Sequence, residues 1–465
     1  MTTAAPKLTA LHDDLVAKVE ELAKQHNVPG VAVGILSDGE EDYVFHGVTS
    51  IENPLEVDAE TLFQIGSTSK TYTATVLAIL ADRGLVDLSA PVRRYIPGLE
   101  LQDEDVAARV TVLNLLNHTA GWVGDIHEDT GDGDDALAIY ATKLAEVDQQ
   151  SPLNTIAAYN NASLNLAGHL IENVTGKTFE AAVKELLLDP VGMTDSYYFL
   201  ADIITRRFTV GHREVDEKLS VTRPYAIPRS VHPAGGIIAT IGDQLKYARF
   251  HLGDGTGRDG VRVISEAALK RMQETTFPFK AGAIADEVGT SWLIRDVTGV
   301  RLVGHGGATN GQMAAFQMVP EKGLAIASLT NADQGALLNR DLVKWLLEKR
   351  IGLVQKDDEP IDLPAEKLAV FAGKFDGGVA ILDITVEDDH LVLQSTYTEK
   401  GLQQARVLLG QDPPAQPPTK AKAAPGDSLI VVEGPAKGMK VAVVRNDNGE
   451  VDAINFGGRL VRRVR

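Results

Sequence analysis

The 465-residue sequence contains no cysteine, which excludes a disulfide framework, a thiolate metal site and a cysteine nucleophile. It also has no uninterrupted apolar run of about eighteen residues, so we expect no membrane-spanning helix and no membrane partner. The N-terminal stretch MTTAAPKLTALHDDLVAKVEELAKQ lacks the basic flank and apolar segment of a secretory leader. We therefore expect a cytoplasmic protein.

Positive charge is in short supply. Lysine and arginine together number 45 against 64 aspartates and glutamates, which gives a formal net charge of −19. Such an excess of negative charge argues against nucleic acid or an anionic membrane surface as a partner. The apolar fraction of 44% and the charged fraction of 23% are typical of a folded globular chain.

Metal-binding patterns are also scarce. The eleven histidines include no H-x-x-x-H pair, which disfavours a catalytic zinc site, and we expect neither a metal nor an organic cofactor. The acidic stretch DIHEDTGDGDD, residues 125–135, does not have the spacing of an EF-hand loop. We interpret it as a solvated loop; the alternatives are a binding site for a substrate ammonium group or for calcium.

The order of apolar patterns predicts an α/β fold. Residues 8–26 have apolar side chains at helical spacing, and residues 30–50 form two apolar runs around a turn signal, which indicates a β-hairpin. Patterns between about 75 and 270 are mostly helical, residues 287–331 are again strand-like, and residues 338–352 form a closing helix. We therefore expect a mixed antiparallel sheet flanked by helices, with an inserted all-α lobe.

A chain of this length is expected to contain more than one domain. The first is expected to span residues 1–354. Its α/β part would lie at about 1–75 and 270–354, and the helical lobe at about 76–269. In this layout both ends of the region contribute strands to one sheet.

A second, smaller domain is expected at the C-terminus. Residues 355–363 are polar and contain proline, which predicts a linker. Residues 364–465 carry short β-like runs separated by turn signals, and their regular spacing predicts a small all-β, barrel-like domain. Within it, the proline-rich residues 410–427 are expected to form a mobile loop.

A serine and a lysine lie three residues apart in FQIGSTSKTYTATVLAIL, where an extended stretch turns into a helical one. If the helix begins near Ser67, Ser67 and Lys70 share one face, and Ser67 lies at the positive end of the helix dipole. A buried lysine loses its proton more readily and can then activate a nucleophile. Taken alone, the pair is better interpreted as a capping serine and a solvated lysine.

Two further motifs have side chains suited to proton transfer. Tyr159 and Asn161 precede an apolar helix, where a phenol can relay a proton and an amide can hold a lysine or a substrate carbonyl. The alternative is an aromatic plug and a helix cap. His305-Gly306-Gly307 ends a β-run, and its glycines allow a substrate backbone to approach closely. The alternative there is a tight turn with a surface histidine.

In this order, S-x-x-K, Y-x-N and H-x-G resemble the serine β-lactamase and penicillin-binding-protein superfamily, and in particular its class C-like branch. LLNHTAGW at 115–122 and HPAGGIIATIGDQLKYARF at 232–250 are also typical of that branch. The resemblance covers roughly residues 8–350. It implies the β-lactamase/transpeptidase-like fold and an acyl-enzyme mechanism.

The resemblance implies a role for each matching side chain. Ser67 would attack a carbonyl, and Lys70 would accept its proton together with Tyr159, which then protonates the leaving group. Asn161 would orient Lys70 and the substrate amide. His305 would replace the lysine that relatives carry on this strand and would hydrogen-bond near Tyr159.

The resemblance also implies a substrate-binding strand. The oxyanion hole would use the backbone N–H groups of Ser67 and Ala308. Gly306 and Gly307 would allow the substrate backbone to lie against the strand. Because Gly306 lacks the hydroxyl found in K-T-G enzymes, we expect weak β-lactamase activity at most.

The C-terminal region resembles the lipocalin-like domain appended to several such hydrolases, and its end, GGRLVRRVR, is similar to theirs. In some relatives an arginine near this end binds a substrate carboxylate. Arg459 is the first candidate for that role and Arg462 the second. The alternative is a solvated basic terminus.

These features together predict a cofactor-free serine hydrolase that forms an acyl-enzyme with a peptide amide or an ester, of the D-aminopeptidase or DD-peptidase kind. A carboxylesterase and a peptide-cyclising thioesterase would share the same catalytic residues. A non-catalytic sensor on the same fold is the alternative from another class. A small molecule or a peptide is the expected substrate.

Overall fold

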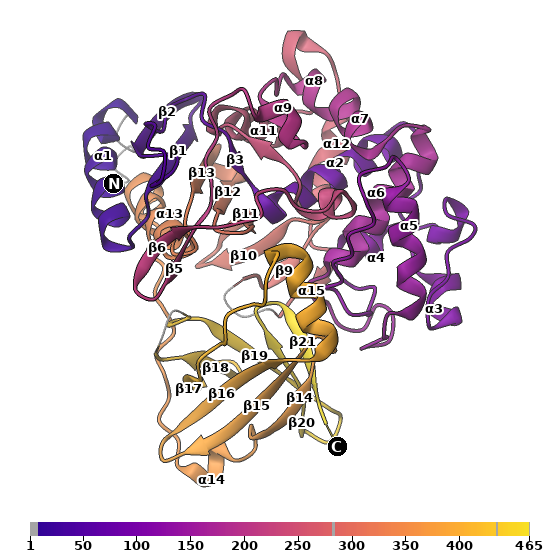
Figure 1. The fold of residues 1–465 in the computed structure, drawn as a ribbon, viewed down its shortest axis with the longest axis vertical. Coiled ribbons are helices and arrows are strands. Elements are labelled where there is room, and N and C mark those ends of the chain that lie inside the picture. Colours follow the sequence, from indigo (N-terminus) through magenta and orange to yellow (C-terminus); the bar gives the residue numbers. More distant parts are fainter. Residues whose placement is uncertain (1–7, 281–283, 434–435, 465) are drawn as a thin grey trace.

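The computed structural model describes residues 8–280, 284–433 and 436–464 (Figure 1). Its main domain is built on an eight-stranded antiparallel sheet in the order β2-β1-β13-β12-β11-β10-β9-β8, so the first hairpin pairs with strands from residue 277 onward. The expected sheet assembled from two distant segments is therefore confirmed. The strands are β1 (Gly30–Ser37), β2 (Glu40–Gly47), β8 (Phe277–Pro278), β9 (Glu287–Val288), β10 (Leu293–Val297), β11 (Val300–Ala308), β12 (Met313–Val319) and β13 (Leu324–Thr330).

Helices cover both faces of this sheet. On one face, α1 (Leu8–Gln25) and α13 (Gly335–Ile351) bury their apolar stripes; Leu15 and Val19 of α1 are completely enclosed. On the other face lie α11 (Ile241–Leu252) and α2 (Ser69–Asp82). Every residue of β1 is buried, as its continuous apolar run requires for a strand covered on both faces.

The helical lobe lies beside the sheet and packs against α2 (Figure 1). All residues of α2 from Ser69 to Leu80 are buried, so this helix forms the centre of the main domain. Two small sheets interrupt the lobe region, one of β3 (Phe63–Gln64), β7 (Ile238–Ala239) and β4 (Ser196–Tyr197), the other of β5 (His212–Val215) and β6 (Lys218–Val221). The lobe and nearby helices are α3 (Glu104–Arg109), α4 (Val112–Leu116), α5 (Ala136–Lys143), α6 (Asn161–Thr175), α7 (Phe179–Val183), α8 (Asp189–Val191), α9 (Leu200–Ile203), α10 (His232–Gly235) and α12 (Glu266–Met272).

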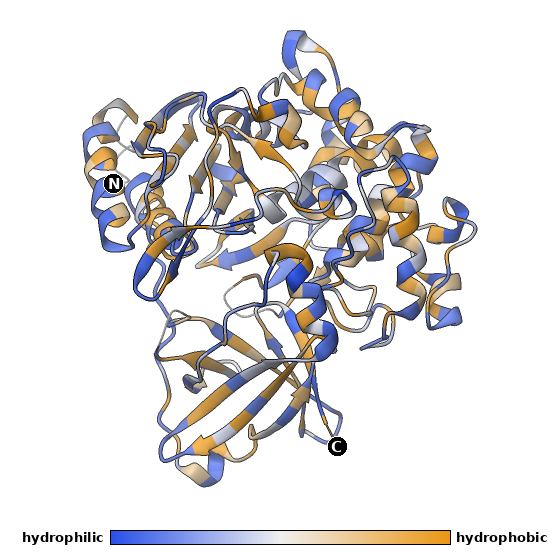
Figure 2. Cartoon of the chain, in the orientation of Figure 1, coloured by the Kyte–Doolittle hydropathy of each residue, from blue (hydrophilic) through white to orange (hydrophobic). Residues whose placement is uncertain are grey.

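The C-terminal domain is a closed eight-stranded barrel, which confirms the expected all-β architecture. Pairing of Phe375 with Arg463 joins the first strand to the last. Apolar and polar segments alternate along its strands, so one side of each strand faces the enclosed core (Figure 2). The strands are β14 (Gly373–Asp376), β15 (Ala380–Glu387), β16 (His390–Tyr397), β17 (Thr419–Ala424), β18 (Ser428–Val431), β19 (Lys440–Arg445), β20 (Val451–Phe456) and β21 (Arg459–Arg463).

Two features of the barrel differ from the sequence expectation. The predicted loop over 410–427 is wrong in its second half, because residues 419–424 form β17 and pair with β16 and β18. In addition, the amphipathic helix α15 (Glu399–Leu409) lies between β16 and β17 in the chain, and Thr398 caps it by accepting a hydrogen bond from the Gly401 N–H. A short helix, α14 (Ala365–Leu368), precedes the barrel.

The barrel packs directly on the main domain, and α15 lies on the side that faces it (Figure 1). The Tyr159 N–H donates to the Gly458 carbonyl at 2.7 Å, and Ala158 packs against Leu460 in a small apolar cluster. Arg462 Nε donates to the Gln150 carbonyl. None of the helices in the described ranges combines the length and the hydropathy that crossing a bilayer requires.

Candidate active site

Ser67 lies in a short 3₁₀ turn, Gly66–Thr68, immediately before α2, and its Oγ is 2.9 Å from Lys70 Nζ. Glycine is needed at position 66 for two reasons. Its φ of 51° lies in the left-handed region, and a Cβ there would lie 2.6 Å from the Ala308 nitrogen. A Cβ at Gly307 would overlap the Ile65 carbonyl oxygen. The end of β11 therefore lies tightly against the backbone that carries Ser67.

Lys70 is completely buried, with no exposed surface. Its Nζ donates to the Ala234 carbonyl at 2.7 Å and faces Ser67 on its other side. Burial holds the pKa of this amine well below its usual value; the Arg459 charge lowers it further, and Asp125 partly opposes that effect. A neutral amine beside the serine hydroxyl can accept the hydroxyl proton.

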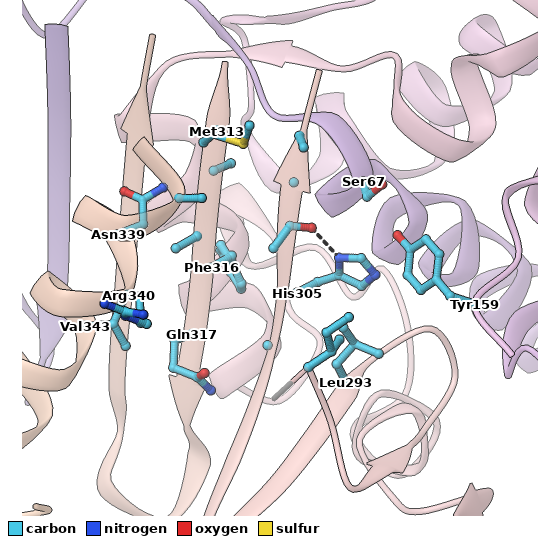
Figure 3. A pocket seen from close by; sticks show the side chains of 18 of the residues that line it. Ser67, Tyr159, Leu293, His305, Met313, Phe316, Gln317, Asn339, Arg340 and Val343 are labelled. Carbon is cyan, nitrogen blue, oxygen red and sulfur yellow. Dashed lines mark hydrogen bonds between the residues drawn. The ribbon is translucent and has the colours of Figure 1, made fainter. Parts of the chain in front are cut away.

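Tyr159 lies just before α6, and its phenol points towards Ser67 (Figure 3). The centroid of its ring is 5.0 Å from Lys70 Nζ and 5.9 Å from the centre of the His305 ring. Burial raises the pKa of this phenol to about 12, although the Arg459 charge and a hydrogen bond with Ser67 act in the lowering direction. The phenol is therefore protonated at neutral pH and can donate to a departing group.

Asn161 is the first residue of α6, which Asn160 caps by accepting from the Ser163 N–H at 2.8 Å. The Asn161 amide donates to Asp125 Oδ1 at 2.6 Å. The expected direct contact between Asn161 and Lys70 is not among the hydrogen bonds of the described residues. Asn161 thus lies in the site, with its amide nitrogen directed to Asp125.

His305 lies on β11 and is 4% exposed. Its Nδ1–H donates to the Gly306 carbonyl at 2.6 Å, which leaves Nε2 as an acceptor. Within the described residues, this buried Nε2 has no hydrogen-bond partner, and the expected hydrogen bond to Tyr159 is replaced by a ring contact. Burial and the Lys70 charge lower the pKa of His305 to about 3, so the imidazole is neutral at physiological pH.

Residues 305–308 of β11 form an open strand edge beside Ser67. On one side they pair with β12, from His305 with Phe316 to Ala308 with Met313. On the other side β10 pairs with β11 only as far as Gly304. The His305 and Gly306 carbonyls already accept side-chain hydrogen bonds, from Thr68 and from the His305 ring, and the other backbone groups of this edge can meet an extended substrate.

The first C-terminal candidate, Arg459, lies at this site, whereas the second does not. The Arg459 guanidinium lies 4.7 Å from the centroid of the Tyr159 ring and forms an ion pair with Asp125. Arg462 instead pairs with Asp452 at 2.7 Å and holds the barrel to the main domain through Gln150. Of the two arginines, Arg459 alone lines the cavity that Ser67 also lines.

The beginning of the acidic stretch 125–135 is part of the site and not a solvated loop, which corrects our interpretation. Asp125 is half-buried between Asn161 and Arg459, and His127 is 9% exposed and lines the same cavity. The position of both residues directly after HTAGW was the one signal in the sequence that favoured this placement. Among the described residues, no group of three or more His, Asp or Glu side chains is arranged to hold a metal ion.

A cavity of about 1250 Å³ begins at Ser67 and extends to the space between the main domain and the barrel. Ser67 and Tyr159 lie on one side of the strand that carries His305, and Asn339 and Arg340 lie on the other (Figure 3). The far part is lined by mostly apolar side chains of β12, by both apolar and charged side chains of α13, by residues 354–358, and by Leu408, Leu409 and Ile430 of the C-terminal domain.

Known proteins share this fold and are similar to this chain in sequence. The family model described as Beta-lactamase matches residues 15–349. Penicillin-binding protein 4 of Amycolatopsis lactamdurans is 33% identical over 342 residues, which cover 72% of this chain and 89% of the relative. The family match therefore includes Ser67, Lys70, Tyr159, Asn161 and His305 within one continuous region.

Solved structures match nearly the whole chain, including the barrel. The crystal structure of SurE has a TM-score of 0.78 and 23% identity, and covers 98% of this chain and 100% of its own. An octameric penicillin-binding protein homologue from Pyrococcus abyssi has a TM-score of 0.65 and 20% identity, with 97% and 99% covered. At these identities the two structures show a common fold. From the family match and the Amycolatopsis relative, we conclude that the chain belongs to the Beta-lactamase family and is a serine hydrolase.

Proposed function

We propose that this protein forms an acyl-enzyme at Ser67 with a peptide substrate and then releases the acyl group to water or to an amine. The observation that carries the proposal is the 2.9 Å approach of Lys70 Nζ to Ser67 Oγ, with Lys70 completely buried. A buried lysine without a paired carboxylate is most stable as the neutral amine. The base required to activate the serine is therefore present without a cofactor.

In the proposed first step, Lys70 accepts the Ser67 proton as Oγ attacks the substrate carbonyl. The backbone N–H groups of Ser67 and Ala308 stabilise the negative charge that develops on the carbonyl oxygen. Tyr159 donates a proton to the leaving amine or alcohol and regains one from Lys70. Water or a second amine then attacks the Ser67 ester and releases the product.

His305 acts as a neutral hydrogen-bonding group in this proposal. Because its Nδ1–H donates to Gly306, its buried Nε2 can accept from the Tyr159 phenol or from a substrate N–H. A neutral imidazole offers no charge to a substrate carboxylate at this strand. That role falls to Arg459, whose guanidinium lies 4.7 Å from the centroid of the Tyr159 ring.

The size of the cavity favours a peptide over a small ester. Its volume of about 1250 Å³ exceeds the range of roughly 300–1,000 Å³ that is usual for small-molecule sites. The open edge at residues 305–308 also suits a peptide backbone, which a small ester lacks. The same volume favours peptide cyclisation as the second candidate, because a long acyl chain could fold back and present its own amine.

The decisive experiment is labelling of Ser67. Incubation with a fluorophosphonate or a labelled penicillin, followed by peptide mass spectrometry, is expected to find the adduct on Ser67. Ser67→Ala should lose the adduct and all turnover of aminoacyl amides, peptidyl thioesters and p-nitrophenyl esters, while its melting temperature stays close to that of the wild type. Retained turnover in this variant would refute the nucleophile, and an unlabelled wild type would favour the non-catalytic sensor.

A further inference from the structure

Asp125 joins two groups that come from distant parts of the chain. Its carboxylate accepts hydrogen bonds from Arg459 Nε at 2.9 Å and Nη2 at 3.2 Å, and from Asn161 Nδ2 at 2.6 Å. Asn161 begins α6 of the main domain, and Arg459 begins β21 of the barrel. One carboxylate therefore ties both groups to the edge of the proposed catalytic centre.

These bonds use only part of the Arg459 guanidinium. Nε and Nη2 donate to Asp125, and Nη1 donates to the Gly457 carbonyl at 3.0 Å. A guanidinium has five N–H groups, so one remains on Nη1 and one on Nη2. Two such donors can hold a carboxylate in a bidentate manner. Asp125 thus fixes the orientation of Arg459 without exhausting its capacity to bind substrate.

Asp125 and Arg459 are also the two charged side chains that act on the pKa of Lys70, Asp125 by raising it and Arg459 by lowering it. Lys70 Nζ and the Arg459 guanidinium lie over the same Tyr159 ring, at 5.0 and 4.7 Å from its centroid. Among the described residues, the other titratable groups that influence or contact Lys70 are neutral at pH 7, because burial lowers the histidine pKa values and raises that of the phenol. These groups are His118, His127, His305 and Tyr159.

We infer that Asp125 is a positioning residue that holds Arg459 and Asn161 in their working orientation and offsets the Arg459 charge at Lys70. The inference rests on the proposed function, since it concerns the same serine and lysine. The Asp125 carboxylate itself is ionised at neutral pH. Burial raises its pKa, but the charge and hydrogen bonds of Arg459, together with His127 and the Asn161 hydrogen bond, outweigh burial and lower that pKa to about 2. Without this carboxylate, no negative charge would oppose the lowering of the Lys70 pKa by Arg459.

The test separates charge from hydrogen bonding. Asp125→Asn keeps the shape of the side chain and an acceptor for Arg459 but removes the charge, whereas Asp125→Ala removes both. Removing a nearby negative charge lowers the pKa of a lysine. The acid limb of the fluorophosphonate labelling rate at Ser67 should therefore move to lower pH by roughly one unit in both variants. Arg459→Gln should move it in the opposite direction.

The loss of hydrogen bonds should appear only in the alanine variant. At the plateau of the pH profile, Asp125→Ala should lower kcat/KM for a carboxylate-bearing peptide by about tenfold or more, and Asp125→Asn by less. Asp333→Asn is the matched control. Asp333 also pairs with an arginine, at 2.6 Å from Arg213 Nε, but does not line the cavity. This control should leave the acid limb where it is in the wild type.

The outcomes distinguish this inference from the proposed function. If wild-type Ser67 is labelled but the acid limb of Asp125→Asn coincides with that of the wild type, Asp125 has only a structural role and the inference is wrong. An equal shift of the acid limb in Asp333→Asn would likewise contradict the inference. If wild-type Ser67 takes no label at any pH, the proposed function and this inference fail together. Melting temperatures identify any variant that is unfolded, and the Arg459→Gln shift then tests the same electrostatic coupling.

Discussion

At the scale of single residues, the site depends on burial that changes protonation. Lys70 has no exposed surface, and His305 is 4% exposed. For both side chains burial disfavours the charged form, so each pKa is lowered. Because the pKa of His305 is lowered to about 3, protonation of His305 is not expected to set an acid limb near the ordinary imidazole pKa.

The first prediction concerns the origin of the acid limb. As pH falls from 7, His305 stays neutral until about pH 3, whereas protonation of Lys70 removes the proposed base. His305→Gln should therefore lower kcat/KM for a p-nitrophenyl ester but leave the acid limb at the same pH as in the wild type. A pH series of kcat/KM between pH 4 and 9 measures this. Disappearance of the limb in the variant would assign it to His305.

At the scale of elements, the site depends on the fit of β11 against the turn before α2. Gly66 and Gly307 allow the two backbones to approach so closely that neither position has room for a side chain. Gly306 differs from both. A Cβ at Gly306 would meet only the Ala314 carbonyl oxygen, at an ordinary contact distance of 3.6 Å. Neighbouring glycines of one motif thus serve different purposes.

The second prediction uses this difference. Gly307→Ala should push β11 away from Ser67, because the new methyl group overlaps the Ile65 carbonyl oxygen. We expect a loss of about 1–3 kcal/mol in the free energy of unfolding, together with slower labelling of Ser67. Gly306→Ala is the stability control, and its unfolding midpoint in urea should match that of the wild type. Equal stability of both variants would show that the close approach is not essential.

At the scale of the whole molecule, the barrel completes the site. It supplies Arg459, it accepts the hydrogen bond from the Tyr159 N–H, and its α15 side chain Gln404 accepts one from the His127 N–H. The cavity extends from Ser67 into the space between the two domains. Substrate length is therefore expected to matter through contacts with both domains.

The third prediction tests the far part of the cavity. Ala315 on β12 lines it, and Ala315→Trp should fill much of it without touching Ser67. KM for a long peptidyl thioester should rise at least about tenfold, which corresponds to roughly 1.4 kcal/mol of lost binding, while KM for p-nitrophenyl acetate stays unchanged. Ala369→Trp, at an exposed position preceding the barrel, is the control. An equal rise in KM for both substrates would indicate that the substitution distorts the site as a whole.

The sequence by itself determined the order of the helical and strand-like regions of the main domain and the candidate catalytic side chains. Apolar periodicity is local, so the helix at α1, the first hairpin and the strands after residue 287 could be predicted from it. The motifs that contain Ser67, Tyr159 and His305 were likewise visible as short patterns. The helix α15 and strand β17 were missed. The helix α15 lies on the side of the barrel that faces the main domain, and β17 is defined by its pairing with β16 and β18, so both depend on contacts with distant segments.

Only the tertiary structure decided how the site is assembled and charged. Asp125 and Arg459 are 334 positions apart, and no local pattern indicates that they form an ion pair. The pKa directions of Lys70 and His305 follow from burial, which depends on every segment packed around them. The cavity is lined by residues of both domains, because it extends from Ser67 into the space between the main domain and the barrel. Such properties arise from contacts between distant segments, and local patterns in the sequence therefore do not predict them.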